Sequence, residues 1–421
     1  MGLTSFMAIT GFLKSMLRLF ARIRSSFDLQ DRNYRLSLYN GWLAAWGGAF
    51  FNATIVLASF ATRLGANNTL IGLLPALGAA GGSLPQAFLA SYVSRLPRKI
   101  ILYRRVALLR LSGLLILAGS AFCLAGHPSL LLLALFFGLG INAFFTGFSS
   151  LAFWGTLAKV IPPSALGRLI GWRNLGGGLL AFFAGFLIRL LLSSSLGFPR
   201  SYGVIFLLGA LLQGLAWYTF SQIAEPPEPG TPTAISLKLP LLNPQFRSFL
   251  LARLLQSLAA LVEPFYAVYA AKVLNLNQVG LFLIVFTLAE ILSNLLWIRL
   301  LTRRSSIYVF QIGALLALVA PLIALLLPPA LFAGVFIFQG AYTAVFNLAP
   351  STYLLELAPP EARSSYIGLL NTLTGILAFA PILGGLVADL LGFPALFLIA
   401  SLLYGLCLAA TRILKPALHA A

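Results

Sequence analysis

The chain has 421 residues, of which 60% are hydrophobic and only 9% are charged. A typical soluble domain has about a quarter of its residues charged, so these few charges could not cover a water-facing surface. The apolar residues also occur in runs of twenty or more, which are too long for core strands. Composition therefore excludes an ordinary soluble protein and predicts an integral membrane protein.

The formal net charge of +19 raises the possibility of a nucleic-acid partner. Lysine and arginine bind phosphates when they form one continuous stripe, but here they lie in short patches between apolar runs. Such patches are typical of the cytoplasmic loops of membrane proteins. We therefore expect membrane lipids as neighbours and no nucleic acid.

The chain begins with a basic segment, residues 1–36, in which Lys14 and Arg18 lie among phenylalanine and leucine residues. This pattern predicts a cytoplasmic amphipathic helix at the membrane surface.

Twelve apolar runs follow in two sets of six, and each run is long enough to span a bilayer. The first six lie within residues 37–221 and the second six within residues 248–413. Between them, residues 222–247 are rich in proline and predict an extended, exposed cytoplasmic linker. Residues 414–421 form a short tail. By position, the runs cover roughly 38–62, 69–93, 106–126, 128–156, 170–193 and 203–221, then 249–271, 277–298, 306–327, 329–355, 366–388 and 393–411.

The distribution of basic residues predicts the orientation. If both termini are cytoplasmic, 22 of the 28 lysine and arginine residues, Arg173 among them, fall on the cytoplasmic side. Two more, Arg110 and Arg253, fall inside the runs. The positive-inside rule therefore places both termini in the cytoplasm and the protein in a plasma or inner membrane.

The two halves also share an internal repeat. Residues 157–178 align without gaps with residues 354–375, at an offset of 197, and the match includes two Pro-Pro pairs and the asparagines Asn174 and Asn371. Because each half has an even number of spans, the two copies share one orientation. The sequence thus predicts an all-α membrane protein whose two six-helix bundles form parallel repeats.

Twelve spans, a central linker and parallel halves resemble the major facilitator superfamily of secondary transporters. That family has a signature between spans two and three, and Ala90–Lys99 is similar to it, with Ser94 at the acidic position. The counterpart in the second half ends in Arg303 and Arg304. The resemblance implies twelve helices around a central cavity. The loop cations are expected to fix topology, to contact anionic lipids or to form salt bridges between the halves; they are Arg95, Arg98, Lys99, Arg303 and Arg304.

Two carboxylates lie near the middle of spans, Glu263 in span seven and Glu290 in span eight. An ionisable residue at this depth is costly, so it tends to face a wet cavity or a partner. Each glutamate is a candidate for proton coupling or for binding a cationic substrate. The alternative is a structural hydrogen bond between helices. Pro264 favours a role for Glu263 because it interrupts the helix, and Tyr266 lies one turn further on.

Three mid-membrane amides accompany these carboxylates. Asn142 in span four and Gln339 in span ten are related by the offset of 197, and Asn52 lies at a similar depth in span one. The resemblance implies that these amides surround a substrate together with Glu263 and Tyr266. The alternative is polar contact between helices.

These features predict a secondary active transporter that moves an unidentified small solute by alternating access, with Glu263 as the candidate for proton coupling. A non-transporting membrane scaffold, such as an assembly or pigment-carrier factor, is the alternative. No HExxH, GxSxG or phosphate-loop motif predicts an enzyme. Cys123 and Cys407 lie far apart without a CxxC or histidine partner, so no metal site or cofactor is predicted. We expect a monomer.

Overall fold

A computed structural model describes residues 32–227, 239–359 and 362–415. The expected amphipathic helix in residues 1–31, the middle of the linker and the last six residues fall outside this part.

The first half consists of six helical passes. The first pass is broken into three pieces, and the other five are single helices. The bounds are α2 (Arg32–Ala49), the π-helical turn η1 (Ala53–Leu57), α3 (Ala58–Arg63), α4 (Asn68–Ser94), α5 (Lys99–Cys123), α6 (Pro128–Val160), α7 (Pro163–Leu192) and α8 (Arg200–Ser221).

The second half repeats this order after the linker. A 3-10 turn, η2 (Leu239–Leu242), leads into it. The passes are α9 (Pro244–Ala259) with η3 (Ala260–Val262) and α10 (Phe265–Lys272), then α11 (Val279–Arg303), α12 (Ser306–Leu326), η4 (Pro329–Gly334) with α13 (Val335–Leu357), and finally α14 (Arg363–Leu377) with α15 (Ala380–Thr411).

Ten segments of the described residues are long and apolar enough to span a membrane, and one of them, Ser365–Thr411, is 47 residues long. Gly392 divides that segment, because its φ of 83° lies in the left-handed region that glycine tolerates. The 27-residue helix α4 adds one more apolar pass. The structure therefore has twelve passes and, in its described part, no strand, which confirms the predicted fold class.

The helices extend beyond the apolar runs mainly at the end of the molecule where the linker lies. Helix α5 begins at Lys99 and α7 at Pro163, each about seven residues before the corresponding run. Hydropathy detects only the hydrocarbon core, whereas a helix continues into the polar interface. Proline is also well suited to the first helical position, since its N–H would have no partner there.

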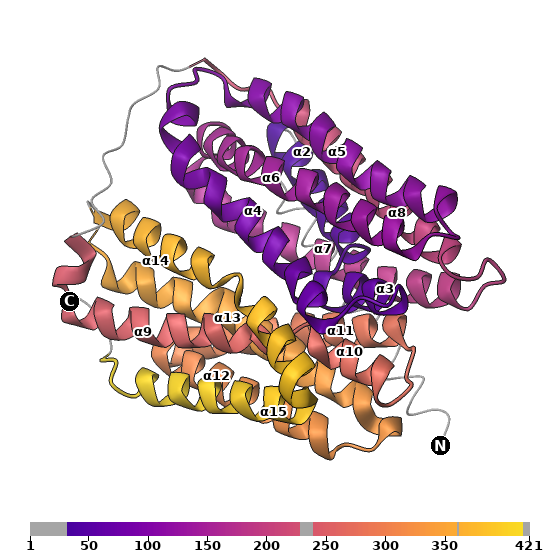
Figure 1. Cartoon of the computed structure of the whole chain (residues 1–421). Helices are drawn as coiled ribbons and strands as arrows, with labels where there is room; N and C mark the ends of the chain where they lie inside the picture. The colour runs from indigo at the N-terminus through magenta and orange to yellow at the C-terminus, as the bar shows by residue number, and fades with distance from the viewer. Residues whose placement is uncertain (1–31, 228–238, 360–361, 416–421) are drawn as a thin grey trace, which may run out of the picture.

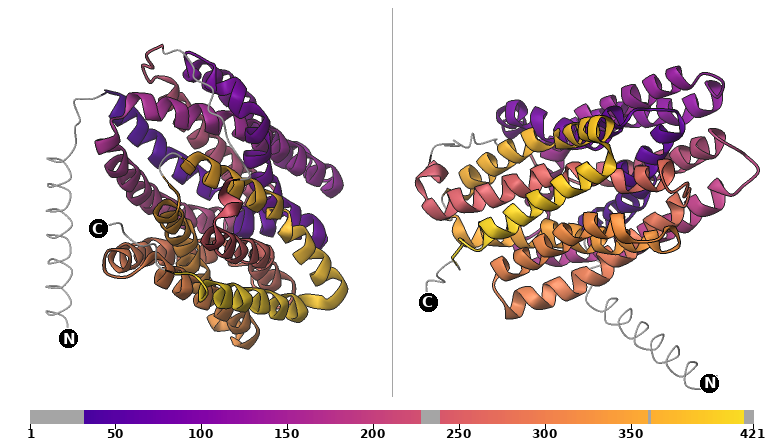
Figure 2. Two further views of the ribbon diagram at one scale, coloured as in Figure 1. Left: turned by 90° about the vertical axis from the view of Figure 1, so that its left-hand side faces the viewer. Right: turned by 60° about the horizontal axis from the view of Figure 1, so that its bottom comes forward.

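The two halves form two bundles that lie against each other (Figure 1). Across the boundary α3 contacts α10, α4 contacts α15, and α7 contacts α11. Seen from two further sides, the helices of each bundle lie roughly alongside one another (Figure 2). The closest approaches use glycine: a Cβ atom at Gly72 would collide with the Pro381 carbonyl, and one at Gly385 with the Asn68 carbonyl. These contacts lie at the end of the molecule opposite the linker.

The outer surface is strongly apolar. Large aliphatic side chains point outward on many helices, for example Leu108 at 71% exposed and Leu326 at 81% exposed. A water-soluble monomer rarely exposes so much contiguous apolar surface. These side chains therefore form the lipid-facing surface of a membrane protein.

The linker differs from the prediction of an exposed connection. Ile223 and Glu225 are buried, at 2% and 7% exposed, and the second half begins helically at Leu239 rather than near residue 248. The described start of the linker therefore lies against the protein.

Candidate functional site

The first and seventh passes are interrupted at corresponding places in the two halves. Helix α2 ends at Ala49, and the turn η1 restarts the pass at Ala53. Helix α9 ends at Ala259, and α10 restarts at Phe265 after η3 and Pro264. In transporters with internal repeats, a pair of interrupted helices at matching positions is a pointer to the binding site.

Asn52 caps the first of these interruptions. Its Oδ1 accepts a hydrogen bond from the Ile55 amide at 2.9 Å and another from the Thr54 hydroxyl at 3.1 Å. The amide that the sequence placed beside a substrate therefore has its oxygen engaged in holding the broken backbone.

Glu263 lies at the second interruption and is half-buried. Gln339 in α13 donates from Nε2 to the Glu263 carbonyl oxygen at 3.3 Å. The Glu263 carboxylate interacts electrostatically with three tyrosines, Tyr266, Tyr342 and Tyr404, which we call the tyrosine cluster. The structure thus brings Glu263, Tyr266 and Gln339 together, as the sequence suggested.

The buried hydroxyls of the tyrosine cluster lie close to one another. All three side chains are fully buried. The Tyr342 hydroxyl is near enough to those of Tyr266 and Tyr404 for side-chain hydrogen bonds, although their orientation is poor, and the Gln339 Oε1 atom has no partner among the described residues. Most buried polar atoms in proteins have a partner, so each exception requires an explanation. The sequence reading missed Tyr342 and Tyr404, although Tyr342 lies three residues from Gln339 and therefore on the same side of α13.

Glu290 lies apart from this cluster. It is half-buried on α11, at the place where α11 packs closely on Gly340 of α13: a Cβ there would lie 3.0 Å from the Glu290 amide nitrogen. Its carboxylate makes no hydrogen bond or ion pair within the described ranges of the chain. Glu290 remains a candidate for proton coupling.

Asn142 belongs to a second polar group, in the first bundle. Its Oδ1 accepts a hydrogen bond from Arg110 Nε at 3.3 Å, and Arg110 Nη1 donates to the Ser149 hydroxyl at 2.9 Å. The Arg110 guanidinium lies over the Trp217 ring, 4.1 Å from its centroid. The sequence placed Arg110 inside a span but did not select it as a site residue.

Arg173 reaches the same interior from α7. Its Nη1 donates to Asn40 Oδ1 at 3.1 Å and to the Ser37 carbonyl, and its guanidinium lies 5.1 Å from the Phe153 ring centroid. Counting Arg173 with the cytoplasmic loop charges was therefore wrong, because it lies ten residues into a helix. We call Arg110 and Arg173 the arginine pair.

The five loop cations lie where expected, at the linker end. Arg95 and Arg98 bracket the turn between α4 and α5. Arg303 is the last residue of α11 and Arg304 follows it, and all four are exposed. No ion pair is found for these four within the described residues. Arg304 lies 5.8 Å from the Tyr308 ring centroid. A salt-bridge role between the halves stays a prediction.

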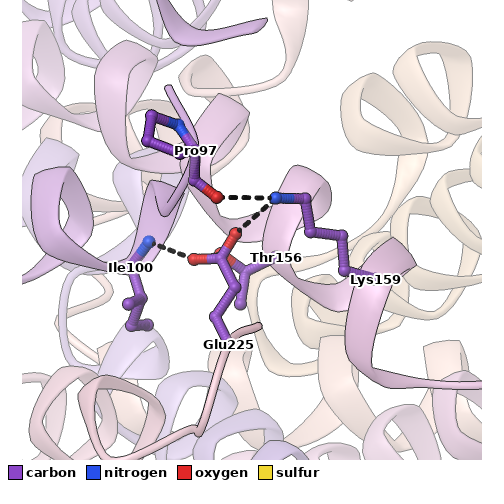
Figure 3. Close-up of polar contacts among 5 residues, drawn as sticks. All are labelled: Pro97, Ile100, Thr156, Lys159 and Glu225. Carbon is purple, nitrogen blue, oxygen red and sulfur yellow. Dashed lines mark hydrogen bonds and ion pairs between the residues drawn. The ribbon is translucent and has the colours of Figure 1, made fainter. Parts of the chain in front are cut away.

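The linker supplies the carboxylate for this region. Glu225 Oε2 accepts a hydrogen bond from the Ile100 amide at 2.7 Å and one from the Thr156 hydroxyl at 3.3 Å (Figure 3). Its Oε1 lies 3.1 Å from Lys159 Nζ, which also donates to the Pro97 carbonyl at 3.0 Å. A carboxylate at the first turn of α5 is favourable because it satisfies a free amide and opposes the helix dipole. Glu225 therefore stabilises the turn between α4 and α5, which follows Ser94.

At the opposite end a second carboxylate joins the two bundles. Asp389 of α15 accepts hydrogen bonds from the Asn68 and Thr69 amides at 3.1 and 3.0 Å and from the Thr69 hydroxyl at 2.8 Å. Lys272 donates to Asn68 Oδ1 at 2.9 Å. We call these four residues the Asp389 clasp. It joins the N-terminus of α4 to both α10 and α15.

Twelve apolar passes in two parallel bundles, with interrupted helices in matching positions, define an integral membrane protein of the secondary-transporter class. The sequence model of the Major Facilitator Superfamily matches residues 249–420. The second half of the chain is therefore similar in sequence to the major facilitator superfamily of secondary transporters.

Solved structures of similar fold cover both bundles. A variant of the nucleoside transporter NupG has a TM-score of 0.70 at 14% identity, covering 91% of this chain and 100% of its own. A POT family transporter in complex with 5-aminolevulinic acid has a TM-score of 0.68 at 15% identity, with 91% and 95% covered. A bacterial homolog of the human lysosomal transporter Spinster, inward-facing and unoccupied, has a TM-score of 0.62 at 14% identity, with 91% and 98% covered. No curated protein sequence matches the chain significantly.

Proposed function

We propose that the protein moves a small solute by alternating access and that proton binding at Glu263 drives the movement. The observation that carries this proposal is the position of the Glu263 carboxylate. It lies at the interruption of the seventh pass, beside the three buried hydroxyls of the tyrosine cluster. A carboxylate without a fixed cation nearby can exchange its proton as exposure switches from one side of the membrane to the other.

The two bundles, residues 37–221 and 248–413, act in this proposal as rocking units. The hydrogen bonds found between the bundles in the described residues lie in the Asp389 clasp and its neighbour Ala66, at the end opposite the linker. The positive-inside rule assigns the linker end to the cytoplasm. On that assignment the described conformation is closed to the outside, and both termini are cytoplasmic in a plasma or inner membrane.

The remaining site residues support these movements. Asn52 holds the interruption of the first pass, Gln339 binds the backbone at Glu263, and Asn142 is the partner of Arg110. Glu290 is the second candidate for proton exchange. The protein acts as a monomer, and the proposal includes no enzymatic step.

The test uses the purified full chain in proteoliposomes that contain a pH-sensitive dye. Candidate solutes are added under an imposed proton gradient, and saturable solute-dependent proton flux is measured. Glu263→Gln keeps the size of the side chain but cannot release a proton, so we expect it to abolish the pH dependence of solute exchange. Glu356→Gln is the matched control, because Glu356 binds the Ser306 hydroxyl at the linker end.

An unchanged proton response in folded Glu263→Gln would remove this residue from the mechanism. Absence of flux for every solute, together with a stoichiometric protein or pigment in the purified sample, would favour the membrane scaffold instead.

A further inference from the structure

The first bundle has an uncompensated positive interior. From Arg32 to Ser221 the sequence contains no aspartate or glutamate. Helices α5 and α7 nevertheless carry Arg110 and Arg173 into the bundle, where their hydrogen-bond partners are neutral amides, a hydroxyl and a carbonyl. Neutral acceptors satisfy N–H groups but do not cancel a charge. A cation at this depth is retained when it faces a wet cavity or binds a counter-charge.

The two arginines lie at a common depth. Arg110 is eleven residues into α5 and Arg173 ten residues into α7, both counted from the linker end. At the rise of an α-helix each lies roughly 15 Å from that end. Tyr103 of α5 interacts electrostatically with both guanidinium groups, so the two side chains share one neighbourhood.

Both side chains keep unused donors. Arg110 uses Nε and Nη1, and Arg173 uses Nη1, in the hydrogen bonds found among the described residues. Neither residue is fully buried. A guanidinium offers five N–H donors in a planar fork, and that geometry matches carboxylate and phosphate oxygens.

We propose that the arginine pair binds a small organic oxyanion, a carboxylate or a phosphate ester, and that this anion is the transported solute. The statement that the anion is transported rests on the proposed function. The statement that the arginine pair binds the anion does not depend on it. The anion supplies the negative charge that the first bundle lacks. A proton carried on Glu263 in the second bundle would then offset the charge of the anion as both cross the membrane.

Binding is tested by thermal unfolding of the detergent-purified full chain with sodium succinate, sodium benzoate or sodium phosphate. Sodium chloride of equal ionic strength is the reference. We expect at least one of the three oxyanions to raise the unfolding temperature of the wild type above the chloride value. Arg110→Gln and Arg173→Gln should each weaken that anion's affinity roughly tenfold or more, because a buried hydrogen-bonded charge pair is lost.

Two further variants keep the test decisive. Arg105→Gln removes an exposed cation from the same helix and should bind the anion like the wild type. Arg110→Lys retains the charge without the fork, so it should fold even if the glutamine variant does not, and bind more weakly than the wild type. The inference is overturned if no oxyanion exceeds chloride, or if Arg105→Gln loses as much affinity as Arg110→Gln. A third outcome would also overturn the inference: phosphatidylglycerol stabilises the protein in an arginine-dependent way and the soluble anions do not. The arginine pair would then bind lipid headgroups.

Flux measurements separate this inference from the proposed function. Arginine-dependent anion binding without any flux in proteoliposomes would support the anion site and contradict the transporter proposal. Saturable proton-coupled flux of a neutral or cationic solute, unchanged in Arg110→Lys, would support the transporter and overturn the anion site.

Discussion

Glu225 offers a sharp test of how the linker stabilises the first bundle. Its side chain is fully buried, and that of Lys159 is 11% exposed. Glu225→Ala would leave the Lys159 ammonium and the Ile100 amide without their main acceptor. Removing one partner of a buried ion pair costs about 3–5 kcal/mol. The Pro97 carbonyl still accepts from Lys159, so we expect the lower end of this range, about 3 kcal/mol.

Glu225→Gln separates charge from shape. A glutamine oxygen still accepts a hydrogen bond from the Ile100 amide, but the ion pair with Lys159 is lost. Hydrogen bonds to charged groups contribute about 1.5–3 kcal/mol, so we expect a loss of about 2 kcal/mol. For a bundle of this size that corresponds to a fall in unfolding temperature of roughly 4–8 °C. The measurement is thermal unfolding in detergent, followed by tryptophan fluorescence.

A double-mutant cycle checks the assignment of the effect. Lys159→Met alone leaves a buried carboxylate without its cation, so it should also destabilise. The double variant Glu225→Gln with Lys159→Met should lose clearly less stability than the sum of the single losses, because each change removes the same contact. Wild-type unfolding temperatures for both Glu225 variants, or strictly additive losses in the cycle, would refute the reasoning.

The remaining predictions concern closure at the end opposite the linker. Asp389→Asn weakens the charge-assisted hydrogen bonds to α4. A cysteine introduced at Ala66 should then react several-fold faster with a membrane-impermeant maleimide. Equal reaction rates in the two proteins would show that the clasp does not hold the closed state. Gly72→Ala places a methyl group against the Pro381 carbonyl and should separate the bundles there, as measured by spin-label distances, with reduced solute exchange. Gly78→Ala on the same helix meets nothing within 4 Å and is the matched control, so an equal effect of both changes would contradict steric closure.

Most of the fold could be predicted from the sequence because the bilayer imposes a length on every pass and requires backbone groups to bond within helices. The main boundary errors have the same cause. Helices α5 and α7 begin about seven residues before their apolar runs, because they continue into the interface, where hydropathy gives no signal. Glu225 was expected to be exposed because composition describes a proline-rich segment but not its tertiary contacts.

The candidate site was only partly predictable. Depth in the membrane selected Glu263 and Gln339, and the structure brings them together. The depth of a residue in the membrane does not determine which group its amide binds. The hydrogen bond by which Asn52 caps η1 was therefore not predicted. Tyr404 comes from the last pass, some 140 positions from Glu263, and only the packing of the second bundle places it near that carboxylate. Sequence spacing carries no information on such long-range contacts.

The internal repeat and the two polar groups together explain why the halves are not interchangeable. Asn142 and Gln339 occupy equivalent positions at the offset of 197, yet Asn142 accepts a hydrogen bond from a cation and Gln339 donates one to the backbone at a carboxylate. The repeated backbone is therefore retained while the chemistry differs: the first bundle has cations without acids, and the second has carboxylates and tyrosine hydroxyls as well as Arg253. Two bundles with different polar interiors would hold a polar solute in one orientation. A double variant with Arg110→Glu and Glu263→Arg would conserve the net charge of the chain. It would nevertheless not restore the same carrier.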